Sequence, residues 1–265
     1  MLIILTGKPG TGKTLTMTSI AYKYFKDDNP PFKVWFTEKI RRKKYIYTIR
    51  EYSDFPIVFK RPKKNKIYYY YDENDEIKSC THLCSLKTRI FDLTLDNKFQ
   101  EGSKFFFDEI QAKYDSMEYK DFPDSIAHYC QAHRHFGNDI YISSQSQSRI
   151  IKRILVLGEE YQDIQQFRKI FGFGIATIRK TWDMSASLEQ GIYTDKLADV
   201  VYYRRIFRLK KIGNMYDSKY LRNLQIGAKE YKSNMYDSLQ LDKQDLLNSF
   251  FPSEEEKKRL KNMRY

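Results

Sequence analysis

The segment LIILTGKPGTGKTL, residues 2 to 15, places glycines, a lysine and a threonine at fixed intervals directly after an apolar run. Its centre, from Gly7 to Thr14, fits the pattern G-x-x-x-x-G-K-[ST] without a mismatch. Glycines permit a tight turn whose backbone N–H groups face phosphate oxygens, and a helix that begins at the lysine adds its positive end. Lys13 would then reach the β- and γ-phosphates of a nucleotide, and the Thr14 hydroxyl would hold Mg²⁺. The predicted nucleotide-binding residues are Gly7, Lys8, Pro9, Gly10, Thr11, Gly12, Lys13, Thr14 and Leu15.

Two carboxylates follow the apolar run KFFF, residues 104 to 107. Asp108, at the end of this expected strand, would bind Mg²⁺ through water, and Glu109 would orient and deprotonate an attacking water. Such a pair indicates a nucleotide hydrolase, because a nucleotide kinase needs no carboxylate to activate water. Alone, the pattern fits any strand that ends at the surface. After a phosphate-binding loop, it predicts the Mg²⁺ and hydrolysis site.

The segment DIYISSQ, residues 139 to 145, predicts another core strand that ends in a polar residue. If this strand lies between the other two, Gln145 would lie beside the γ-phosphate and could position the water. The alternative is a residue that only ends the strand. We therefore expect Lys13, Glu109 and Gln145 as catalytic residues, Thr14 and Asp108 as metal ligands, and ATP and Mg²⁺ as cofactors.

These side chains must be positioned by strands and helices. LIILT predicts a short buried strand, and KVWF, residues 33 to 36, predicts a second one. The helix between them would bury one face, formed by Met17, Ile20, Ala21 and Tyr24. Strand, helix and strand in this order predict a parallel sheet. A further helix is expected over residues 124 to 136, with Gly137 as its end.

The remaining segments predict an insertion and a C-terminal extension. PIVFK and KIYYYYD, on either side of RPKKN, predict a β-hairpin with a basic tip. A helix is expected from residue 148 to about 166, followed by antiparallel strands at residues 171 to 182 and 200 to 210. The expected fold class is α/β, a P-loop NTPase with a mainly parallel central sheet, an inserted β-hairpin and a small C-terminal β/α extension. The expected domains are a core at 1–165 with a basic insertion at about 41–100, an antiparallel β extension at 166–226, and a helical tail at 227–265.

Composition limits the class of protein. The chain has 265 residues and a net charge of +13, and residues 33 to 66 hold twelve Lys and Arg against three Asp and Glu. A basic excess favours a polyanionic partner, although charge runs usually mark solvated faces. Three cysteines, an odd number, argue against a disulfide framework and for a reducing cytoplasm. No apolar run approaches the ~20 residues of a membrane-spanning helix, and the N-terminus lacks the pattern of a signal peptide.

The basic tip of the expected hairpin is a candidate for nucleic-acid contact. Long cations on a turn can reach phosphates without reading bases. The tyrosines from 68 to 71 alternate across the expected strand, so one face could offer rings to unstacked bases while the other joins the core. Solubility or an anionic membrane surface are the alternative reasons for such a basic run. The DNA-binding candidates are Lys60, Arg61, Lys63, Lys64 and Lys66.

Two segments, FFFDEIQ and HRHFGNDIYISSQ at residues 133 to 145, resemble motifs of the zonular occludens toxin (Zot) family. That family includes the morphogenesis ATPases of filamentous phages, and the resemblance extends over roughly residues 1 to 155. It implies a P-loop ATPase related to the FtsK–HerA group of DNA pumps, with Lys13, Thr14, Asp108, Glu109 and Gln145 in the roles given above. His133, Arg134, His135 and Gly137 match the family's motif, and their interpretation here is structural, as the turn from helix to strand.

The resemblance implies an ATP-hydrolysing motor for phage assembly that exports or packages viral DNA, with single-stranded DNA as the first expectation. The implied partners are phage coat or membrane assembly proteins and further copies of the chain in a homo-oligomeric ring. In a ring, a neighbouring subunit supplies an arginine to the γ-phosphate, for which Arg149, Arg153 and Arg134 are candidates. Basic residues that merely solvate an exposed helix are the alternative.

Phage assembly proteins of this family typically carry a membrane-spanning segment after the ATPase domain, and this sequence shows none. We therefore expect the host cytoplasm, or a peripheral position at the inner face of the membrane. Two other functions fit the same loop: an ATP-binding switch with slow turnover, and a small-molecule phosphotransferase with a P-loop fold. The pair Asp108 and Glu109 argues against the phosphotransferase.

Overall fold

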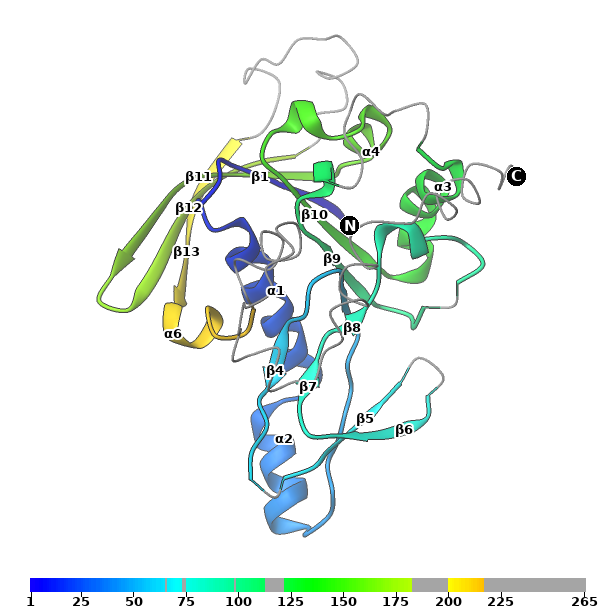
Figure 1. Ribbon diagram of the computed structural model, residues 1–265, viewed down its shortest axis with the longest axis vertical. Coiled ribbons are helices and arrows are strands. Elements are labelled where there is room, and N and C mark those ends of the chain that lie inside the picture. Colours follow the sequence, from blue (N-terminus) through cyan, green and yellow to red (C-terminus); the bar gives the residue numbers. More distant parts are fainter. Residues whose placement is uncertain (65, 73–74, 98, 113–121, 183–199, 217–265) are drawn as a thin grey trace, which may run out of the picture.

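The computed structural model describes residues 1–64, 66–72, 75–97, 99–112, 122–182 and 200–216 (Figure 1). Its strands are β1 (Leu2–Thr6), β2 (Ile46–Tyr47), β3 (Glu51–Ser53), β4 (Val58–Lys60), β5 (Tyr68–Tyr71), β6 (Ile77–Cys80), β7 (Leu83–Cys84), β8 (Leu86–Lys87), β9 (Lys104–Phe107), β10 (Asp139–Ser144), β11 (Glu160–Ile170), β12 (Phe173–Trp182) and β13 (Val200–Arg208). Its α-helices are α1 (Lys13–Asp28), α2 (Pro31–Trp35), α3 (Asp124–Ala132), α4 (Lys152–Val156) and α6 (Leu209–Ile212). Shorter helical turns are η1 (Phe36–Ile40), η2 (Ile90–Asp92), η3 (Ile110–Ala112), η5 (His133–Phe136) and η6 (Gln147–Arg149).

The central sheet has the strand order β13-β12-β11-β1-β10-β9-β3-β8. From β11 to β8 the strands run parallel, and β12 and β13 extend the sheet as antiparallel strands. β10 pairs with β1 on one side, with Ile4 opposite Ile142, and with β9 on the other, with Ile142 opposite Phe107. The carboxyl ends of β1, β10 and β9 therefore lie side by side, at the edge where open parallel sheets bind ligands.

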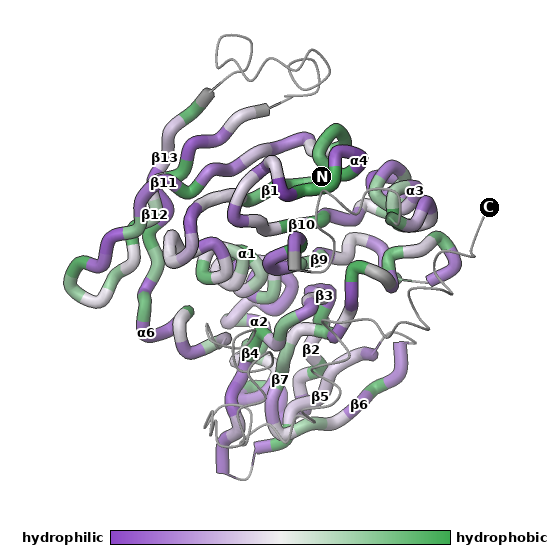
Figure 2. The backbone as a smooth tube through the Cα atoms, turned by 45° about the horizontal axis from the view of Figure 1, so that its top comes forward, coloured by the Kyte–Doolittle hydropathy of each residue, from purple (hydrophilic) through white to green (hydrophobic). Residues whose placement is uncertain are grey.

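Both faces of the central sheet are covered, which makes the core three layers thick. Side chains alternate along β1, so Ile3 and Leu5 pack on the face covered by α1 and Leu2 and Ile4 on the face covered by α3 and α4. On β9, Phe106 likewise packs on the α1 face, whereas Phe105 and Phe107 pack on the opposite face. Burial on both faces explains why these strands read as continuous apolar runs rather than as alternating patterns. Figure 2 shows hydrophobic stretches in the central strands and in α1, where these layers meet.

Most of the elements predicted for the core are confirmed. The strands at β1, β9 and β10 and the helix α1 lie where the sequence places them, and Met17, Ile20 and Ala21 of α1 are buried. β10 lies between β1 and β9, which is the condition on which the expected role of Gln145 depends. α3 continues into η5 and ends at Gly137, which has a left-handed φ of 65°. The fold class is α/β with a large, mainly parallel sheet, as expected.

The strand expected at residues 33 to 36 is wrong, because this segment is helical. α2 begins at Pro31, with Pro30 before it, and continues directly into the π-helical turn η1. Proline is favoured at the first position of a helix, since its fixed φ suits the helix and its missing N–H would have no partner there. No residue of α2 or η1 is fully buried, and of the KVWF residues Val34 packs against the edge of the core.

The hairpin expected between PIVFK and KIYYYYD is wrong in its pairing. β4 pairs with β7, whereas β5 pairs in parallel with β2 and antiparallel with β6. The insertion does contain a hairpin, formed by β5 and β6. The basic segment between β4 and β5 is a turn closed by a bridge between Lys63 and Lys66. Strands this short take their partners from non-local packing, which the local sequence does not encode.

The helix expected from residue 148 to about 166 is also wrong. Only α4 is helical there in the α conformation, and β11 begins at Glu160. Gly158 lies between them at a place with no room for a side chain, since a Cβ there would lie 2.8 Å from Ile4 Cδ1 and 2.6 Å from the Tyr161 hydroxyl. The chain thus turns tightly against β1 and enters the sheet. β11 continues past residue 165, so the antiparallel strands are joined to the central sheet without a break.

Two further expectations concern the helical tail and a membrane-spanning helix. The helical tail expected at residues 227–265 lies outside the described residues. Within the described part of the chain, no helix has both the length and the apolar character needed to cross a membrane.

Glu51 gives a test of the buried core. Its side chain is completely buried in β3, and Oε1 has no hydrogen-bond partner among the described residues. Desolvation raises its pKa to about 8, with the nearby Asp28 carboxylate adding to the effect. The folded state then binds this proton more tightly than the unfolded state, so stability is present below the ordinary glutamate pKa and is lost as pH rises through about 8.

We therefore expect Glu51→Gln to gain stability relative to wild type as pH rises from 5 to 8, by up to about 1.4 kcal/mol per pH unit. The measurement is the free energy of unfolding by urea at several pH values. Glu101→Gln, at an exposed glutamate, is the matched control and should stay parallel to wild type. Parallel curves for Glu51→Gln and wild type would show that Glu51 is not a buried, protonated group.

Candidate nucleotide site

Glycines shape the loop between β1 and α1 at two positions. Gly7 has a φ of 148°, and a Cβ there would lie 2.7 Å from Thr11 Oγ1 and 2.8 Å from the Ile164 carbonyl oxygen. Gly12 has a left-handed φ of 87° immediately before α1. Only glycine takes these positions without strain or collision. The loop consequently folds back over the end of β1, and Lys13 becomes the first residue of the helix.

Lys13 is buried at the base of this loop, with 4% of its surface exposed. Its Nζ donates a hydrogen bond to the Gly7 carbonyl at 2.8 Å and lies 3.4 Å from Glu109 Oε1. A buried ammonium group is costly unless charged and polar partners surround it. The geometry therefore joins the cation of the glycine loop to the carboxylate that follows β9.

Thr14 and Asp108 meet at the start of α1. The Thr14 hydroxyl donates to Asp108 Oδ2 at 2.6 Å, and the Ser143 hydroxyl donates to Asp108 Oδ1. Burial raises the pKa of Asp108, and these two hydrogen bonds act against that rise. The Asp108 N–H in turn donates to Asp54 Oδ1 at 3.2 Å, which fixes the backbone at the end of β9.

These oxygens suit Mg²⁺, which prefers hard oxygen ligands and takes much of its shell from phosphate and water. Within the described residues, no three His, Cys, Asp or Glu side chains group into a metal site made of protein alone. A hydroxyl and a carboxylate that already touch, beside a phosphate loop, match instead a metal shared with a nucleotide. A divalent cation would also offset the cost of a buried Asp108 charge.

Glu109 has an unusual backbone. Its φ of 48° lies in the left-handed region, which costs a residue with a side chain of order 1–3 kcal/mol and recurs at functional sites. The Glu109 N–H donates to Ser143 Oγ at 3.1 Å, and Gln111 Nε2 donates to its carboxylate. This turn directs the carboxylate toward Lys13 instead of continuing the strand.

A cleft of about 760 Å³ opens beside these residues. The glycine loop and Glu109 form one end of it. The other walls come from β11, from α6 and from the residues after α6, which the sequence assigned to a separate extension. The lining residues on that side are Phe167, Lys169, Leu209, Lys210, Gly213, Asn214 and Tyr216.

Gln145 and the arginine candidates occupy different places. Gln145 follows β10 at the carboxyl edge, between the ends of β1 and β9, and its side chain is half-buried. Arg149 is exposed in η6. Arg153 forms an ion pair with Asp124 at the start of α3. The sensor role of Gln145 and an arginine supplied to a neighbouring subunit stay predictions.

The HRH motif lies at the opposite end of β1 from the glycine loop. His133 is buried, with Nδ1 hydrogen-bonded to the Cys130 carbonyl, and Arg134 pairs with Glu159. Glu159 Oε1 also accepts the Leu2 N–H at 3.1 Å. The motif thereby ties the end of α3 to the beginning of β1. This link to β1 differs from the helix-to-strand turn that the sequence suggested for the motif, and it places Arg134 away from the glycine loop.

The five cations proposed for DNA contact have unequal surroundings. Lys66 pairs with Glu38 at 3.0 Å, and Arg61 Nη2 donates to the Asn214 carbonyl at 2.6 Å. Lys60 lies over the Tyr47 ring at 5.8 Å, and burial lowers its pKa. Lys63 and Lys64 are exposed. Arg61 is exposed as well, so three of the five cations are exposed, and of these Arg61 is bonded to the chain after α6.

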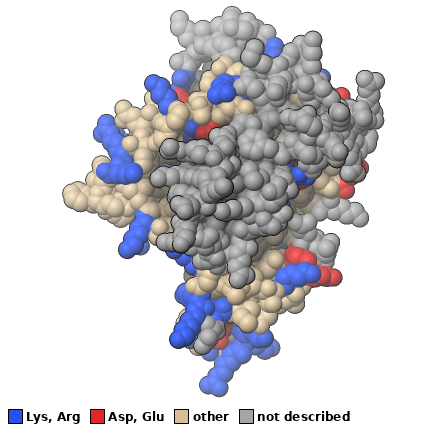
Figure 3. All heavy atoms as spheres, viewed as in Figure 1, with Lys and Arg blue, Asp and Glu red and all other residues tan. Residues whose placement is uncertain are grey.

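A larger basic surface surrounds that turn. Figure 3 shows lysine and arginine side chains gathered at the lower end of the molecule, over α2 and below β4. The segment after η1, residues 41 to 44, adds four exposed cations in succession. We call the exposed residues Arg41, Arg42, Lys43, Lys44, Lys63 and Lys64 the basic end.

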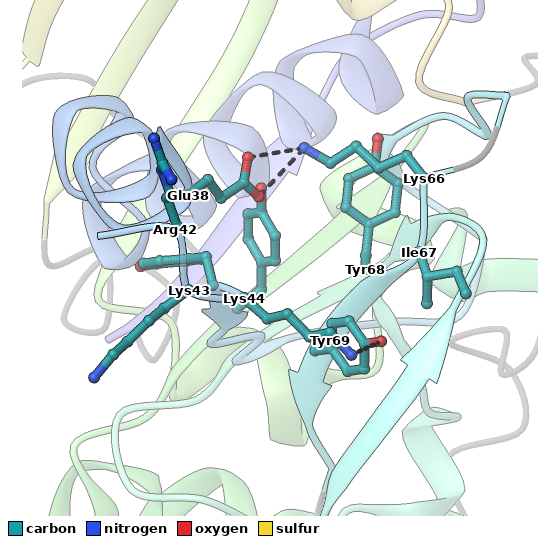
Figure 4. Close-up of a pocket in the computed structure, with 10 residues that line it drawn as sticks. Glu38, Arg42, Lys43, Lys44, Lys66, Ile67, Tyr68 and Tyr69 are labelled. Carbon is teal, nitrogen blue, oxygen red and sulfur yellow. Dashed lines mark hydrogen bonds and ion pairs between the residues drawn. The ribbon is translucent and has the colours of Figure 1, made fainter. Parts of the chain in front are cut away.

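A second cleft, of about 360 Å³, lies within the basic end (Figure 4). In Figure 4, Lys66 reaches the Glu38 carboxylate from one side, and Lys44 lies against the Tyr69 hydroxyl from the other. Lys44 Nζ is also 4.6 Å from the centre of the Tyr69 ring. Tyr68 is buried while Tyr69 is half-buried, so the two faces of β5 differ as the alternation predicts.

Several residues of the site were not predicted from the sequence. Ser143 connects Asp108 and Glu109, and the two serines that precede Gln145 in DIYISSQ are the signal that could have suggested it. Asp54, which directly follows β3, accepts the Asp108 N–H, and nothing in the sequence around Asp54 indicates this contact. Phe167 and Tyr216 both belong to the extension expected at residues 166–226, so no spacing indicated that they would line the cleft.

The comparisons with known proteins give no match at the level of sequence families: neither a family model nor a curated protein matches this chain. Solved structures are similar in fold at low identity. The N-terminal domain of zonular occludens toxin from Neisseria meningitidis aligns with a TM-score of 0.41 and 17% identity, covering 82% of this chain and 98% of that one.

Two other solved structures are similar to the chain. The genome packaging NTPase of Sulfolobus turreted icosahedral virus 2, in complex with ATP-gammaS, aligns with a TM-score of 0.34 and 12% identity over 77% of this chain and 95% of that one. The flagellar accessory protein FlaH from Methanocaldococcus jannaschii aligns with a TM-score of 0.34 and 13% identity over 78% and 84%.

Lys13→Ala tests the phosphate loop. Removing the buried cation should weaken ATP binding by roughly tenfold or more, since hydrogen bonds to charged groups are worth about 1.5–3 kcal/mol. The measurement is the Kd for ATP with Mg²⁺ by calorimetric titration, with the unfolding midpoint to show that the fold persists. Lys23→Ala, at an exposed lysine of α1 outside the loop, is the control and should bind as wild type does. An unchanged affinity in Lys13→Ala would show that this loop does not bind the phosphates of ATP.

Proposed function

We propose that the protein is an ATP-hydrolysing motor. The observation that carries this proposal is the meeting of Lys13, Thr14, Asp108 and Glu109 at the carboxyl edge of three adjacent parallel strands. A cation, a hydroxyl and two carboxylates at this position match the parts that phosphoryl transfer to water requires.

The residues divide the reaction between them. Lys13 neutralises charge on the β- and γ-phosphates, and Thr14 and Asp108 would hold Mg²⁺, which neutralises charge on the phosphates when bound. A phosphate that draws Lys13 away from Glu109 frees that carboxylate. Glu109 then accepts a proton from water as the water oxygen bonds to the γ-phosphorus and the bond to ADP breaks. Gln145, at the end of the strand between them, is proposed to orient this water.

The contact between Lys13 and Glu109 also separates the alternatives. A small-molecule phosphotransferase would need an acceptor other than water, and a carboxylate held at 3.4 Å from the phosphate-binding lysine would favour loss of the phosphoryl group to water. A binding switch with slow turnover would need no such base. The site therefore supports hydrolysis over both.

The proposed work of the motor is the movement of viral DNA during phage assembly. The support is the basic end, which lies on one end of the molecule and carries a half-buried tyrosine, Tyr69, among lysines. Cations of this kind bind a phosphate backbone without regard to sequence, and rings stack on unpaired bases. A homo-oligomeric ring, coat or membrane assembly proteins as partners, and a place in the host cytoplasm belong to the same proposal.

An anionic membrane surface is the second partner that an observation favours. Beside the basic end, α2 and η1 expose Phe32, Trp35 and Ile40, with 71%, 51% and 56% of their surfaces accessible. Aromatic residues next to lysine and arginine are typical of helices that lie on anionic lipid. Such a contact would hold the protein at the inner face of the membrane.

Glu109→Gln should bind ATP but hydrolyse it roughly 10²–10⁴ times more slowly, because the amide cannot accept the proton from water. Steady-state phosphate release and the Kd for ATP measure the two effects separately. Glu101→Gln, an exposed glutamate outside the site, should retain the wild-type rate. Wild-type turnover in Glu109→Gln would assign the base to another residue.

The double substitution Lys63→Ser and Lys64→Ser tests the basic end. It should weaken binding of single-stranded DNA and reduce the slope of log K against log salt by roughly one unit per lost phosphate contact, without changing ATP affinity. The control removes the same charge elsewhere, with Lys23→Ser and Lys152→Ser at exposed positions. An unchanged slope would show that Lys63 and Lys64 do not contact DNA. If the wild-type protein then bound anionic vesicles more tightly than the double variant, the turn would contact a membrane instead.

A further inference from the structure

We propose that the antiparallel extension forms the base-binding half of the nucleotide site, with the rings of Phe167 and Tyr216 holding the nucleobase. This assignment rests on the proposed function, because it concerns the other end of the same nucleotide. According to this proposal, the ligand contacts residues of the extension expected at residues 166–226, which the sequence analysis separated from the P-loop core.

The cleft beside Lys13 is continuous from the glycine loop to the extension. One end is lined by the loop and Glu109, and the other by residues of β11, of α6 and of the segment that follows α6. A triphosphate held at Lys13 leaves the nucleoside in the same cleft. The walls that remain for a base to contact therefore belong to the extension.

Phe167 is fixed beside the phosphate loop. A Cβ added at Gly12 would lie 3.2 Å from its ring, so the ring packs closely on the loop backbone. Behind it, the Phe207 ring of β13 is stacked at 5.9 Å between centroids with planes 16° apart. Phe167 nevertheless remains half-buried and lines the cleft. A half-buried ring that lines the cleft can offer its accessible part to a planar base.

Tyr216 comes from a segment that the insertion holds in place. The Met215 carbonyl accepts the Val58 N–H at 2.8 Å, and the Met215 side chain is buried in the core. One residue earlier, the Asn214 carbonyl accepts Arg61 Nη2 at 2.6 Å. These bonds anchor the chain after α6 to β4 and to the start of the basic turn. The second ring of the base site is thereby connected to the basic end.

The apolar lining of the cleft agrees with this division. The extension contributes two rings and Leu209, and apolar and aromatic walls suit a neutral base. Among the described residues that line the cleft, the single acidic side chain is Glu109, beside the glycine loop. The extension also contributes Lys169 and Lys210, so the cleft as a whole is positively charged, which favours an anionic nucleotide.

The test compares ATP with inorganic triphosphate, which carries the phosphates without a base. Both are titrated in the presence of Mg²⁺ into the full chain and into Phe167→Ala, Tyr216→Ala and Tyr216→Phe. Phe167→Ala and Tyr216→Ala should weaken ATP binding by roughly tenfold and leave triphosphate binding unchanged. Tyr216→Phe keeps the ring and should therefore bind ATP more tightly than Tyr216→Ala does. Phe171→Ala is the control, because that ring is 98% exposed in the turn between β11 and β12.

The outcomes separate the base site from the phosphate site. Selective loss of ATP affinity supports the proposal. Equal losses for ATP and triphosphate would overturn it, since the rings would then only support the loop. Unchanged ATP affinity in both alanine variants would overturn it as well, while leaving the P-loop assignment intact. Failure of wild-type protein to bind either ligand would instead overturn the proposed function, and the base site with it.

Discussion

The site depends on keeping one lysine and two carboxylates at a buried edge of the sheet. Lys13 and Asp108 are 4% and 7% exposed, and Glu109 is 19% exposed. Charges with so little water are stable only when opposite charges and hydrogen bonds surround them. The ion pair between Lys13 and Glu109 and the bonds from Thr14 and Ser143 to Asp108 meet that requirement. Because these partners come from β1, β9 and β10, the parallel order of the strands is a condition of the charge arrangement and not only of the fold.

The same constraint explains why residues far from the chemistry carry specific interactions. The loop can hold Lys13 only if β1 is fixed at both ends. At its far end, the Leu2 N–H is bound by Glu159, which is itself held by Arg134 of the HRH motif. At its near end, Thr6 Oγ1 donates to Asp163 of β11 at 3.2 Å. The HRH motif, although it lies at the opposite end of β1 from the glycine loop, is therefore connected to the site through the position of β1.

The extension changes how the molecule is divided. β11 is parallel to β1 along its first half and antiparallel to β12 along its whole length, so one strand belongs to both parts. Its far half brings Phe167 over the glycine loop, and the chain after α6 returns to hydrogen-bond with Val58 and Arg61. The nucleotide cleft, the extension and the basic end are thus physically linked. The proposed motor would require such a link, because its nucleotide turnover would have to move the surface proposed to contact DNA.

The sequence by itself determined the phosphate loop, the acid pair and the strands that carry them. These features depend on short-range patterns: glycine spacing, the amphipathic face of α1 and uninterrupted apolar runs in strands buried on both sides. It did not determine residues 33 to 36, the pairing of β4 and β5, or the strand that begins at Glu160. Residues 33 to 36 are helical because α2 begins at Pro31, directly after Pro30. β4 and β5 pair with other strands and not with each other, and the strand at Glu160 follows the close approach of Gly158 to β1. Tertiary structure alone decided that Phe167 packs on the glycine loop and that Tyr216 lines the same cleft, because each is brought there by strand order and packing, which local sequence does not encode.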